Sequence, residues 1–441
     1  MDTRLKSLKS FVCVVIIVTS FIVLNDQIKD NRILPFQMFN AIEKHQNSKA
    51  FVITSTRTTK QDSENDREHL YEERRHVINE GCKKINRTKL DRTEISSSTA
   101  GLIIDKVHSI YYCPIPKVSS TFWKRVLTVM ASRGKLNSPF DISLGGVRLA
   151  KINDLSKREL NSLNTKGTSF IVARNPYARL FSGYENKIYH SNLMFWKLTG
   201  RQVVHVIRKD NNDVYNNYGF DVTFPEFIKY ILYLHESGLG INGHFRPMLS
   251  LCDPCSIYFQ YFVKLETLSD DARFLITKWR NDFDDVNLRF EDFEKETVLD
   301  TARGHVNFLF STKKVLDEIK FPFIKIMLRT WRDLQIRGYL SKHIPFPFKE
   351  TDVETVTKEE YMEAIKTALK IPVNRTEVKL QRKEALIQAY RQVPIKDMER
   401  LRQFVLEDCL VFGYDDRPAE LFDRSKSVSR EFVYLDGLTK K

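Results

Sequence analysis

The sequence predicts an α/β protein, a three-layer sandwich with a mostly parallel sheet, preceded by a transmembrane anchor and a stem. Two observations carry the fold class. From residue 107 onward, short β-type runs alternate with segments of helical spacing, a pattern typical of parallel sheets covered by helices. The apolar fraction of 42% in 441 residues is sufficient for a substantial core, which excludes wholesale disorder.

The first 24 residues predict the anchor. Arg4, Lys6 and Lys9 precede an uncharged apolar run at 11–24. The run ends without the small-residue cleavage site of a signal peptide. We therefore expect an uncleaved signal anchor at 10–24, with 1–9 cytosolic and the rest lumenal. A cleaved signal peptide is the alternative, and it leads to the same lumen.

Composition divides the remainder of the chain. Residues 25–105 are polar with little apolar periodicity, which predicts a stem. The charged stretch 64–75 within it predicts a solvated helix. The folded domain is expected at 106–420 and a C-terminal tail at 421–441. Asn86 and Asn374 begin N-x-T triplets and are possible glycan acceptors in a lumenal chain.

The alternation assigns individual elements. Strands are expected at 109–113, 169–173 and 258–264, and helices at 121–130, 176–187, 224–235 and 383–412. Residues 280–380 are charged and mixed, and their pattern assigns no element.

The cysteines indicate disulfides. Cys82, Cys113, Cys252, Cys255 and Cys409 would be lumenal, where disulfides persist. Five is an odd number, so at least one thiol stays free or pairs between chains. For the C-x-x-C pair at 252 and 255, a disulfide to each other, to Cys113 or to Cys409 is favoured over zinc. A structural zinc site needs four ligands, and no second pair stands nearby.

The net charge of +14 favours an acidic partner: nucleic acid, anionic lipid, or a polyanionic or nucleotide substrate. No run of five Lys or Arg residues and no zinc-finger spacing occurs, so nucleic acid is not the leading choice.

A candidate anion site follows the first strand. The loop there runs Pro116-Lys117-Val118-Ser119-Ser120-Thr121. Backbone N–H groups at a helix start have no intrahelical acceptor and, with the helix dipole, bind anions. Lys117 adds a positive charge and the hydroxyls add donors. An ordinary loop with N-capping Ser and Thr is the alternative reading.

A second candidate site follows the second strand. Arg174 stands at its end, where ligands bind in open α/β sheets, and Ser182 lies about two helical turns further on. Arg clamps phosphate bidentately. Two anion sites at neighbouring strand ends suit a nucleotide with two phosphate groups. Arg179 is either a third phosphate ligand or a salt-bridge partner.

Five ordered segments between about 107 and 416 resemble the Golgi carbohydrate sulfotransferases, the group that includes chondroitin 4-sulfotransferases. The first two resemble its donor motifs, through Pro116-Lys117-Val118, Thr121 and Trp123-Lys124-Arg125, and through Arg174, Pro176, Arg179-Leu180, Ser182, Tyr184 and Asn186-Lys187. The other three are 242–255, 264–268 and 408–414.

The resemblance implies a P-loop-like donor site for 3′-phosphoadenosine 5′-phosphosulfate and transfer of its sulfuryl group to a hydroxyl of a chondroitin-like or related glycan in the Golgi lumen. It implies donor contacts from 116–123, Arg174 and Ser182, Phe122 and Trp123 included, although helical spacing places Trp123 in the core. It implies no metal. The chain departs from the pattern at Ser120, Phe122 and Phe245, which stand for Cys, Asn and Trp.

Lys117 and His244 are the expected catalytic residues. Lys117 would stabilise charge on the departing nucleotide, and His244 would accept the hydroxyl proton. His108, His190 and Glu185 are rival bases, and a structural His244 before Pro247 is the alternative. A non-catalytic lumenal glycan-binding protein on the same fold is the alternative function. A kinase-like enzyme is disfavoured because the Walker glycines are missing.

Overall fold

The computed structural model describes residues 60–86, 101–143, 146–156, 158–159, 167–209, 218–288, 293–319, 321–425, 427–428 and 431–435. The predicted tail 1–9 and anchor 10–24 lie outside these residues. Within the described part of the chain, no helix is both long and apolar enough to cross a membrane.

The sheet is mixed, so the prediction of a mostly parallel sheet is wrong. Its strand order is β3-β1-β2-β4-β5. The parallel pairs are β2 with β4 and β4 with β5, whereas β1 is antiparallel to both β2 and β3. Only four residues, 106–109, join β1 to β2. A parallel crossover needs a dozen or more, so this short connection forces a hairpin. The strands are β1 Ile103–Asp105, β2 Ile110–Cys113, β3 Ala150–Lys151, β4 Thr168–Ala173 and β5 Tyr261–Lys264.

The elements predicted on either side of the two anion sites are confirmed. Helix α3 follows β2, α5 follows β4, and α8 lies between α5 and β5. Their bounds are α3 Ser120–Ala131, α5 Pro176–Tyr184 and α8 Phe224–Glu236. The predicted helix 176–187 changes after α5 into a π-helical turn, Glu185–Tyr189. Short helices α6 Leu193–Phe195 and α7 Arg201–Val203 continue the chain before α8.

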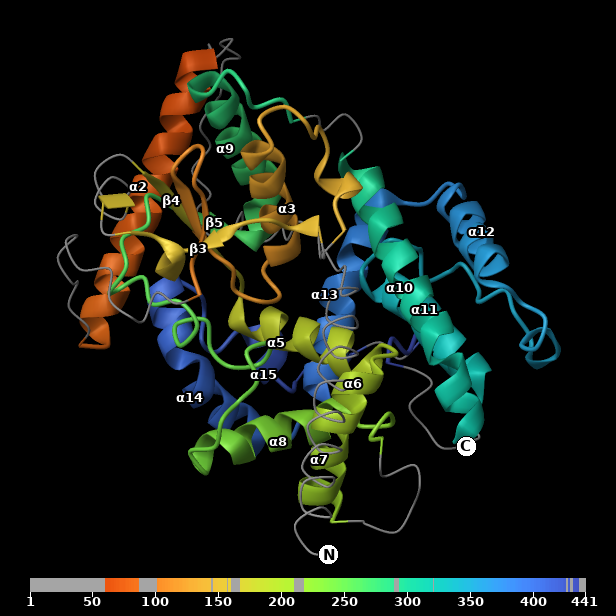
Figure 1. Cartoon of the computed structure of the whole chain (residues 1–441). Coiled ribbons are helices and arrows are strands. Elements are labelled where there is room, and N and C mark those ends of the chain that lie inside the picture. Colours follow the sequence, from red (N-terminus) through yellow and green to blue (C-terminus); the bar gives the residue numbers. More distant parts are fainter. Residues whose placement is uncertain are drawn as a thin grey trace, which may run out of the picture.

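The sheet is covered on both faces. Helices α3 and α9 (Leu268–Asp282) lie on one face (Figure 1). Their Trp123 and Trp279 pack on Phe170 of β4, with ring centroids 4.7 and 5.6 Å away. Trp123 is therefore a core residue, as its helical spacing predicts. On the other face, the register aligns Cys113 with Ile171, and the segment around Cys252 covers them through a disulfide.

The helix expected within 64–75 is present as part of α2 (Lys60–Lys84), but it is solvated on one side only, because Tyr71 and Arg74 are buried. It lies along β5, the edge strand of the sheet (Figure 1). Arg74 and Arg75 donate to the carbonyls of Phe262 and Gln260, at 2.9 and 2.6 Å. Tyr71 is fully buried. An uncovered edge strand would expose unpaired backbone groups, and α2 satisfies these groups. The sequence does not indicate this contact with β5, because the donors are arginine side chains in a charged segment that looks like a solvent-exposed one.

The two disulfides are Cys82–Cys255 and Cys113–Cys252, and Cys409 is a buried free thiol. The preference for disulfides over a zinc site is confirmed. The pairing of Cys255 with Cys82 was missed because Cys82 stands in the predicted stem. The bridge attaches the end of α2 to the folded domain.

Residues 280–380, which the sequence leaves unassigned, are largely helical. They contain α10 Phe293–Glu318, α11 Phe323–Ile336 and α12 Lys358–Leu369. These helices share their own apolar core and lie together beside the sheet (Figure 1). The predicted helical region 383–412 forms two helices, and a short one follows: α13 Arg375–Arg391, α14 Ile395–Phe412 and α15 Ala419–Phe422.

Asp271, in the first turn of α9, tests the contact that α2 makes beside β5. Its buried carboxylate accepts from Arg74, Tyr71 and Thr267 at 2.7–3.1 Å. We expect Asp271→Ala to lower the free energy of unfolding by about 3–5 kcal/mol, because it leaves a buried guanidinium unpaired. Urea denaturation with both disulfides intact measures this.

The adjacent Asp270 provides the control. Its carboxylate is 46% exposed and pairs with Arg67, so Asp270→Ala should cost less than about 1 kcal/mol. Equal losses in the two variants would contradict the contact.

Candidate active site

The loop between β2 and α3 forms a concave set of backbone donors. Lys117 and Ser119 have positive φ, at 72° and 65°, and Val118 between them does not. Such alternation turns successive N–H groups toward one point and makes an anion-binding nest. The first intrahelical bond of α3 comes from Trp123, so the N–H groups of Ser120 and Thr121 have no intrahelical acceptor. This is the geometry expected of the first anion site.

Arg174 and Ser182 lie beside this loop. Because β2 and β4 are parallel, their carboxyl ends meet at one edge of the sheet. Arg174 is buried and donates to the carbonyl of Lys117 at 3.1 Å. The Ser182 hydroxyl and the Ser119 hydroxyl are fully buried with no hydrogen-bond partner among the described residues. Unsatisfied buried hydroxyls are costly, so they indicate a place for a polar ligand.

The cations of this site are buried. Lys117 donates to the side-chain oxygen of Asn186 at 2.9 Å. Burial, then the charges of Arg337 and Lys187, hold the pKa of Lys117 well below its usual range. Burial lowers the pKa of Lys187 to about 7. Burial also lowers the pKa of Arg174 to about 9, and the charge of Arg382 is the next largest cause. A bound polyanion would relieve these penalties.

Arg179 joins the anion loop to the segment 242–255. It donates to the carbonyls of Pro116, Gly243 and Arg246 at 2.7–3.0 Å. These bonds favour neither alternative considered for it, phosphate ligand or salt-bridge partner, because its contacts are backbone carbonyls. The N–H groups of Met248 and Leu249 donate to the buried Asp408 of α14.

Glu266 joins three of the family-like segments. Its carboxylate accepts from the Asn175 N–H at 2.8 Å and from the Tyr414 hydroxyl at 2.9 Å. Asn175 in turn caps α5 through the Ala178 N–H. The entry to α5, and with it the position of Arg174, therefore depends on Glu266, which stands 91 positions after Asn175.

His244 lies in this assembled site. Its Nδ1 is 2.8 Å from the Asn242 Oδ1 and its ring meets the Phe195 ring edge at 5.3 Å between centroids. An amide oxygen only accepts, so Nδ1 carries the proton and Nε2 keeps a lone pair. Burial, then the charges of Lys187 and Lys117, lower the pKa of His244 to about 2. The imidazole is neutral and close to the cations of the anion loop.

The rival bases are engaged elsewhere. His108 is bonded to Asp105 and Asp285 in the hairpin that precedes β2, at the end of the strand remote from the loop. Burial alone would lower its pKa, but these hydrogen bonds raise it. Glu185 accepts two bonds from Arg382. His190 is fully buried against His305.

The structure separates the predicted donor residues by exposure. Ser120 and Thr121 are half-buried, whereas Val118, Phe122 and Trp123 are fully buried. Phe122 and Trp123 pack edge to face in the core, with ring centroids 5.2 Å apart. A donor contact by these two residues would use the backbone. The assignment of 116–123, Arg174, Ser182 and His244 stays a prediction.

Within the described ranges of the chain, one group of side chains could hold a metal ion. His190, His305 and Asp333 are buried, and their possible ligand atoms lie within 4.8 Å of one another. Asp333 already pairs with His305 at 2.6 Å and with Arg337 at 3.1 Å. A cation there would compete with the guanidinium for the same carboxylate. The expectation of no metal stays a prediction.

Sequence reasoning missed three contributors to the site. Asn186 stands in a quoted segment beside Lys187, but nothing indicated its bond to Lys117. Arg337 and Arg382 come from α11 and α13, and no local pattern distinguishes them from the many surface arginines.

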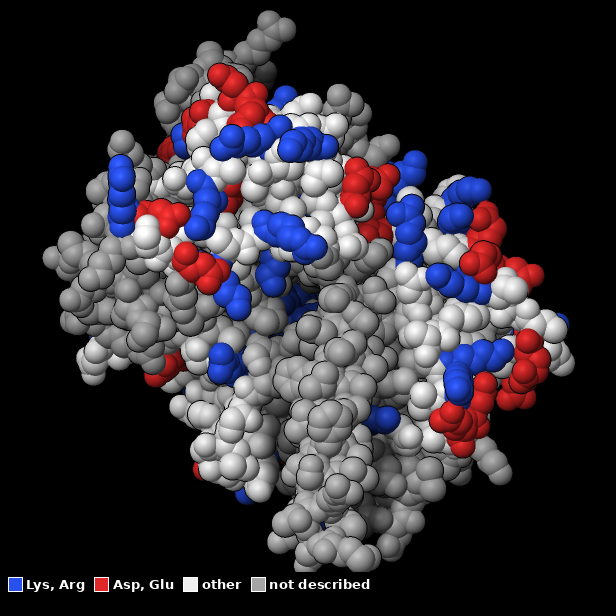
Figure 2. All heavy atoms as spheres, viewed as in Figure 1, with Lys and Arg blue, Asp and Glu red and all other residues white. Residues whose placement is uncertain are grey.

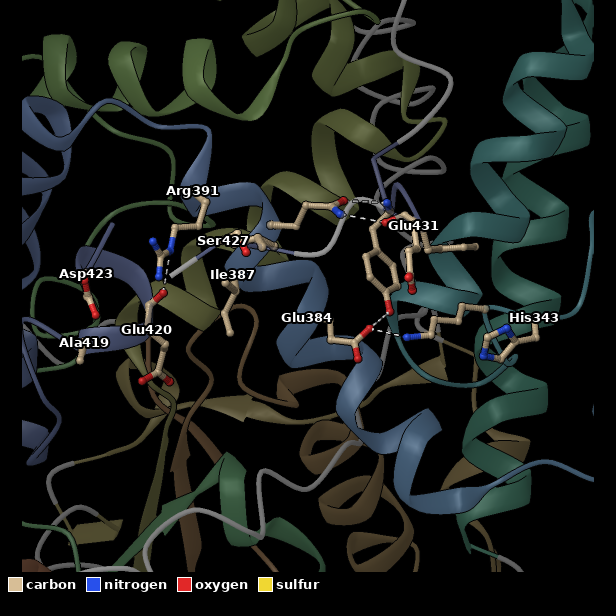
Figure 3. A pocket seen from close by; sticks show the side chains of 14 residues that line it. His343, Glu384, Ile387, Arg391, Ala419, Glu420, Asp423, Ser427 and Glu431 are labelled. Carbon is tan, nitrogen blue, oxygen red and sulfur yellow. Dashed lines mark hydrogen bonds and ion pairs between the residues drawn. The ribbon is translucent and has the colours of Figure 1, made fainter. Parts of the chain in front are cut away.

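The surface agrees with an anionic partner. Figure 2 shows Lys and Arg side chains around a hollow in the middle of one face, in the region of α3 and α5 in Figure 1. A separate cavity of about 770 Å³ lies between the end of α13, α15 and the segment after it (Figure 3). Its lining has both charges, including Lys342, Arg391, Glu384 and Glu420. None of the predicted donor residues lines it, so it is not the candidate site.

Comparisons with known proteins agree with this geometry. Residues 100–310 match the model of the sulfotransferase family. Carbohydrate sulfotransferase 11 of Rattus norvegicus is 30% identical over 214 residues, which are 47% of this chain and 61% of that protein. Carbohydrate sulfotransferase 11 of Danio rerio is 32% identical over 238 residues, covering 52% and 66%. Carbohydrate sulfotransferase 8 of Homo sapiens is 28% identical over 236 residues, covering 53% and 55%. No solved structure matches.

Residues 100–310 therefore match the sulfotransferase family, and the anion loop lies within the matched part of the chain. Within the family, these relatives are carbohydrate sulfotransferases. The resemblance predicted from the five segments is confirmed. The matches span between about half and two thirds of the relatives' own lengths.

Gly183 tests how closely α5 approaches the His244 segment. A Cβ atom there would lie 2.9 Å from the Phe245 ring and 3.0 Å from the His244 carbonyl oxygen. We expect Gly183→Ala to lower the free energy of unfolding by about 1–3 kcal/mol, although alanine is the better helix former.

Gly240→Ala is the control, because nothing lies within 4 Å of its Cβ position. Urea denaturation of both variants measures the difference. A Gly183→Ala variant as stable as Gly240→Ala would show that the segment is free to move.

Proposed function

We propose that this protein transfers a sulfuryl group from 3′-phosphoadenosine 5′-phosphosulfate to a hydroxyl of a chondroitin-like or related glycan. The observation that carries the proposal is the pair of anion sites at neighbouring strand ends. Lys117 and the N–H groups before α3 suit the phosphosulfate, and Arg174 with Ser182 suits the 3′-phosphate. The family match supports the same chemistry.

In the proposed reaction one bond to sulfur forms, another breaks, and one proton is transferred. The glycan hydroxyl oxygen attacks the sulfur, and the bond from sulfur to the bridging oxygen of the nucleotide breaks. Lys117 and the nest stabilise the negative charge that develops on this oxygen. The hydroxyl proton passes to Nε2 of His244, whose Nδ1–H is held by Asn242. The donor and acceptor oxygens need only positioning and charge stabilisation from the protein.

We also propose that the protein works as a single-pass Golgi membrane protein with its folded domain in the lumen. The apolar run at 11–24 motivates the anchor. The two disulfides suit an oxidising compartment. Asn86 and Asn374 are exposed, as glycan acceptors must be. Protease protection of sealed microsomes, with glycosidase treatment, tests this topology.

Sulfate transfer itself is the first test. Purified protein is incubated with radiosulfate-labelled donor and desulfated chondroitin, dermatan, heparan and N-glycan acceptors. We expect at least one acceptor to be labelled. Lys117→Ala should reduce turnover by about 10²–10³-fold, the usual effect of removing one charge-stabilising donor. Arg174→Ala should weaken binding of adenosine 3′,5′-bisphosphate about 10–100-fold, through loss of charged hydrogen bonds.

Lys366→Ala is the control, because it removes the same charge from an exposed ion pair on α12. Absence of both label and nucleotide binding would refute the function. Nucleotide binding without label would favour a non-catalytic glycan-binding protein.

The proposed base predicts a pH dependence. In the free protein, burial and cations keep His244 neutral. Bound donor offsets these cations and should raise the pKa toward its usual value of about 6.5. Turnover at saturating donor should therefore fall as pH decreases from about 7 to about 5.

His244→Ala should lower turnover about 10²–10⁴-fold and abolish this acidic limb, with little change in nucleotide affinity. His235→Ala, at an exposed position of α8, is the control. Turnover in His244→Ala equal to that of His235→Ala would remove His244 as the base.

A further inference from the structure

Glu185 is buried between two arginines from the C-terminal helices. Arg382 of α13 donates to both carboxylate oxygens, at 2.7 and 2.6 Å, and Arg337, the C-cap residue of α11, lies 3.3 Å from one of them. All three residues are at most 4% exposed. We call this group the Glu185 clamp. Both arginines lie outside the residues that match the family, 100–310.

The clamp is adjacent to the anion loop. Glu185 begins the π-helical turn that follows α5, and its carbonyl accepts the His190 N–H that closes the turn. The next residue, Asn186, accepts the hydrogen bond from the ammonium group of Lys117. Single π-helical turns are frequent at functional sites because they redirect side chains. Here the turn directs Asn186 toward Lys117, and the clamp holds its first residue.

The clamp also belongs to a larger charged network. Arg337 donates to Asp333 at 3.1 Å, and Asp333 pairs with His305 of α10. Burial alone would lower the pKa of Arg337, but Asp333 and Glu185 raise it. The guanidinium therefore stays charged. It is the largest charge effect on the pKa of Lys117, and Arg382 is the largest on that of Arg174.

A buried ion pair by itself is weak evidence for stability, because desolvation offsets most of the attraction. A fork-to-fork contact does, however, restrict orientation strongly. The geometry thus suits placement of the π-helical turn better than a gain in stability.

We propose that Arg382 and Arg337 are positioning residues of the sulfate-donor site: by clamping Glu185 they hold Asn186 against Lys117, and so keep the anion loop ready for the nucleotide. This inference rests on the proposed function. It gives α13 and the end of α11 an indirect part in donor binding.

Arg382→Lys is the main test, because lysine keeps the charge but cannot bond both oxygens of Glu185. We expect adenosine 3′,5′-bisphosphate to bind this variant at least tenfold more weakly, by isothermal calorimetry, and the donor KM to rise more than kcat falls. Lys383→Ala is the matched control, because Lys383 is the neighbouring residue, is half-buried and pairs with Glu420. Thermal unfolding verifies that both variants are folded. Affinity in Arg382→Lys equal to the control would overturn the proposal.

A double-mutant cycle with Asn186→Ala tests the route through Asn186. If the clamp acts through this residue, the double variant should bind adenosine 3′,5′-bisphosphate about as well as whichever single variant has the lower affinity. Multiplicative losses would mean independent effects and would also overturn the proposal.

The reactivity of Lys117 gives a readout that needs no nucleotide. The free protein is pulse-labelled with acetic anhydride, and acetylation of Lys117 is followed by mass spectrometry. We expect faster labelling in Arg382→Lys than in Lys383→Ala, because the neutral amino group of Lys117 reacts and it is more accessible to the reagent once Asn186 no longer fixes it. An unchanged rate would refute the positioning role. If the unsubstituted protein fails to bind the nucleotide, the proposed function fails, and this labelling still decides whether the clamp holds Lys117.

Discussion

The burial of Lys117 is the constraint on which the site depends. A buried ammonium group is unfavourable unless it is hydrogen-bonded, and Asn186 supplies the acceptor while Arg174 binds the carbonyl of the same residue. Lys187 and Arg337 lie close enough to disfavour its charge further. The free protein thus holds several cations together at an energetic cost. A polyanionic nucleotide would offset that cost on binding, which couples affinity to the way the loop is held.

Three different attachments bring the His244 segment to the loop. Arg179 binds two carbonyls of the segment and one of the loop. Asp408 of α14 accepts two of its N–H groups, and the Cys113–Cys252 disulfide joins it to the end of β2. Since Gly183 leaves room for direct contact with α5, the proposed base has a defined place relative to both anion sites. These attachments involve neighbours of His244 and leave its Nε2 available.

Buried side chains and helix contacts support the backbone of the candidate donor site. Phe122 and Phe245 are both core residues in this chain, and the backbone that they support carries the loop and the His244 turn. The edge strand β5 is covered by α2, and Glu185 is neutralised by α11 and α13. Without these contacts, backbone carbonyls along β5 would lack a donor and the buried carboxylate of Glu185 would lack a cation.

The sequence by itself determined the alternation of strands and helices around the two anion sites, the preference for disulfides, and the family. These follow from local periodicity and from short ordered segments, which need no knowledge of distant partners. The tertiary structure decided the mixed sheet, the packing of α2, the Cys82–Cys255 pairing, and the bond from Lys117 to Asn186. It also decided which arginines enter the site, because Arg337 and Arg382 resemble surface residues until Glu185, 152 and 197 positions away, is brought beside them. Such pairings form only when the folded chain brings distant segments together, so the sequence around either residue does not indicate them.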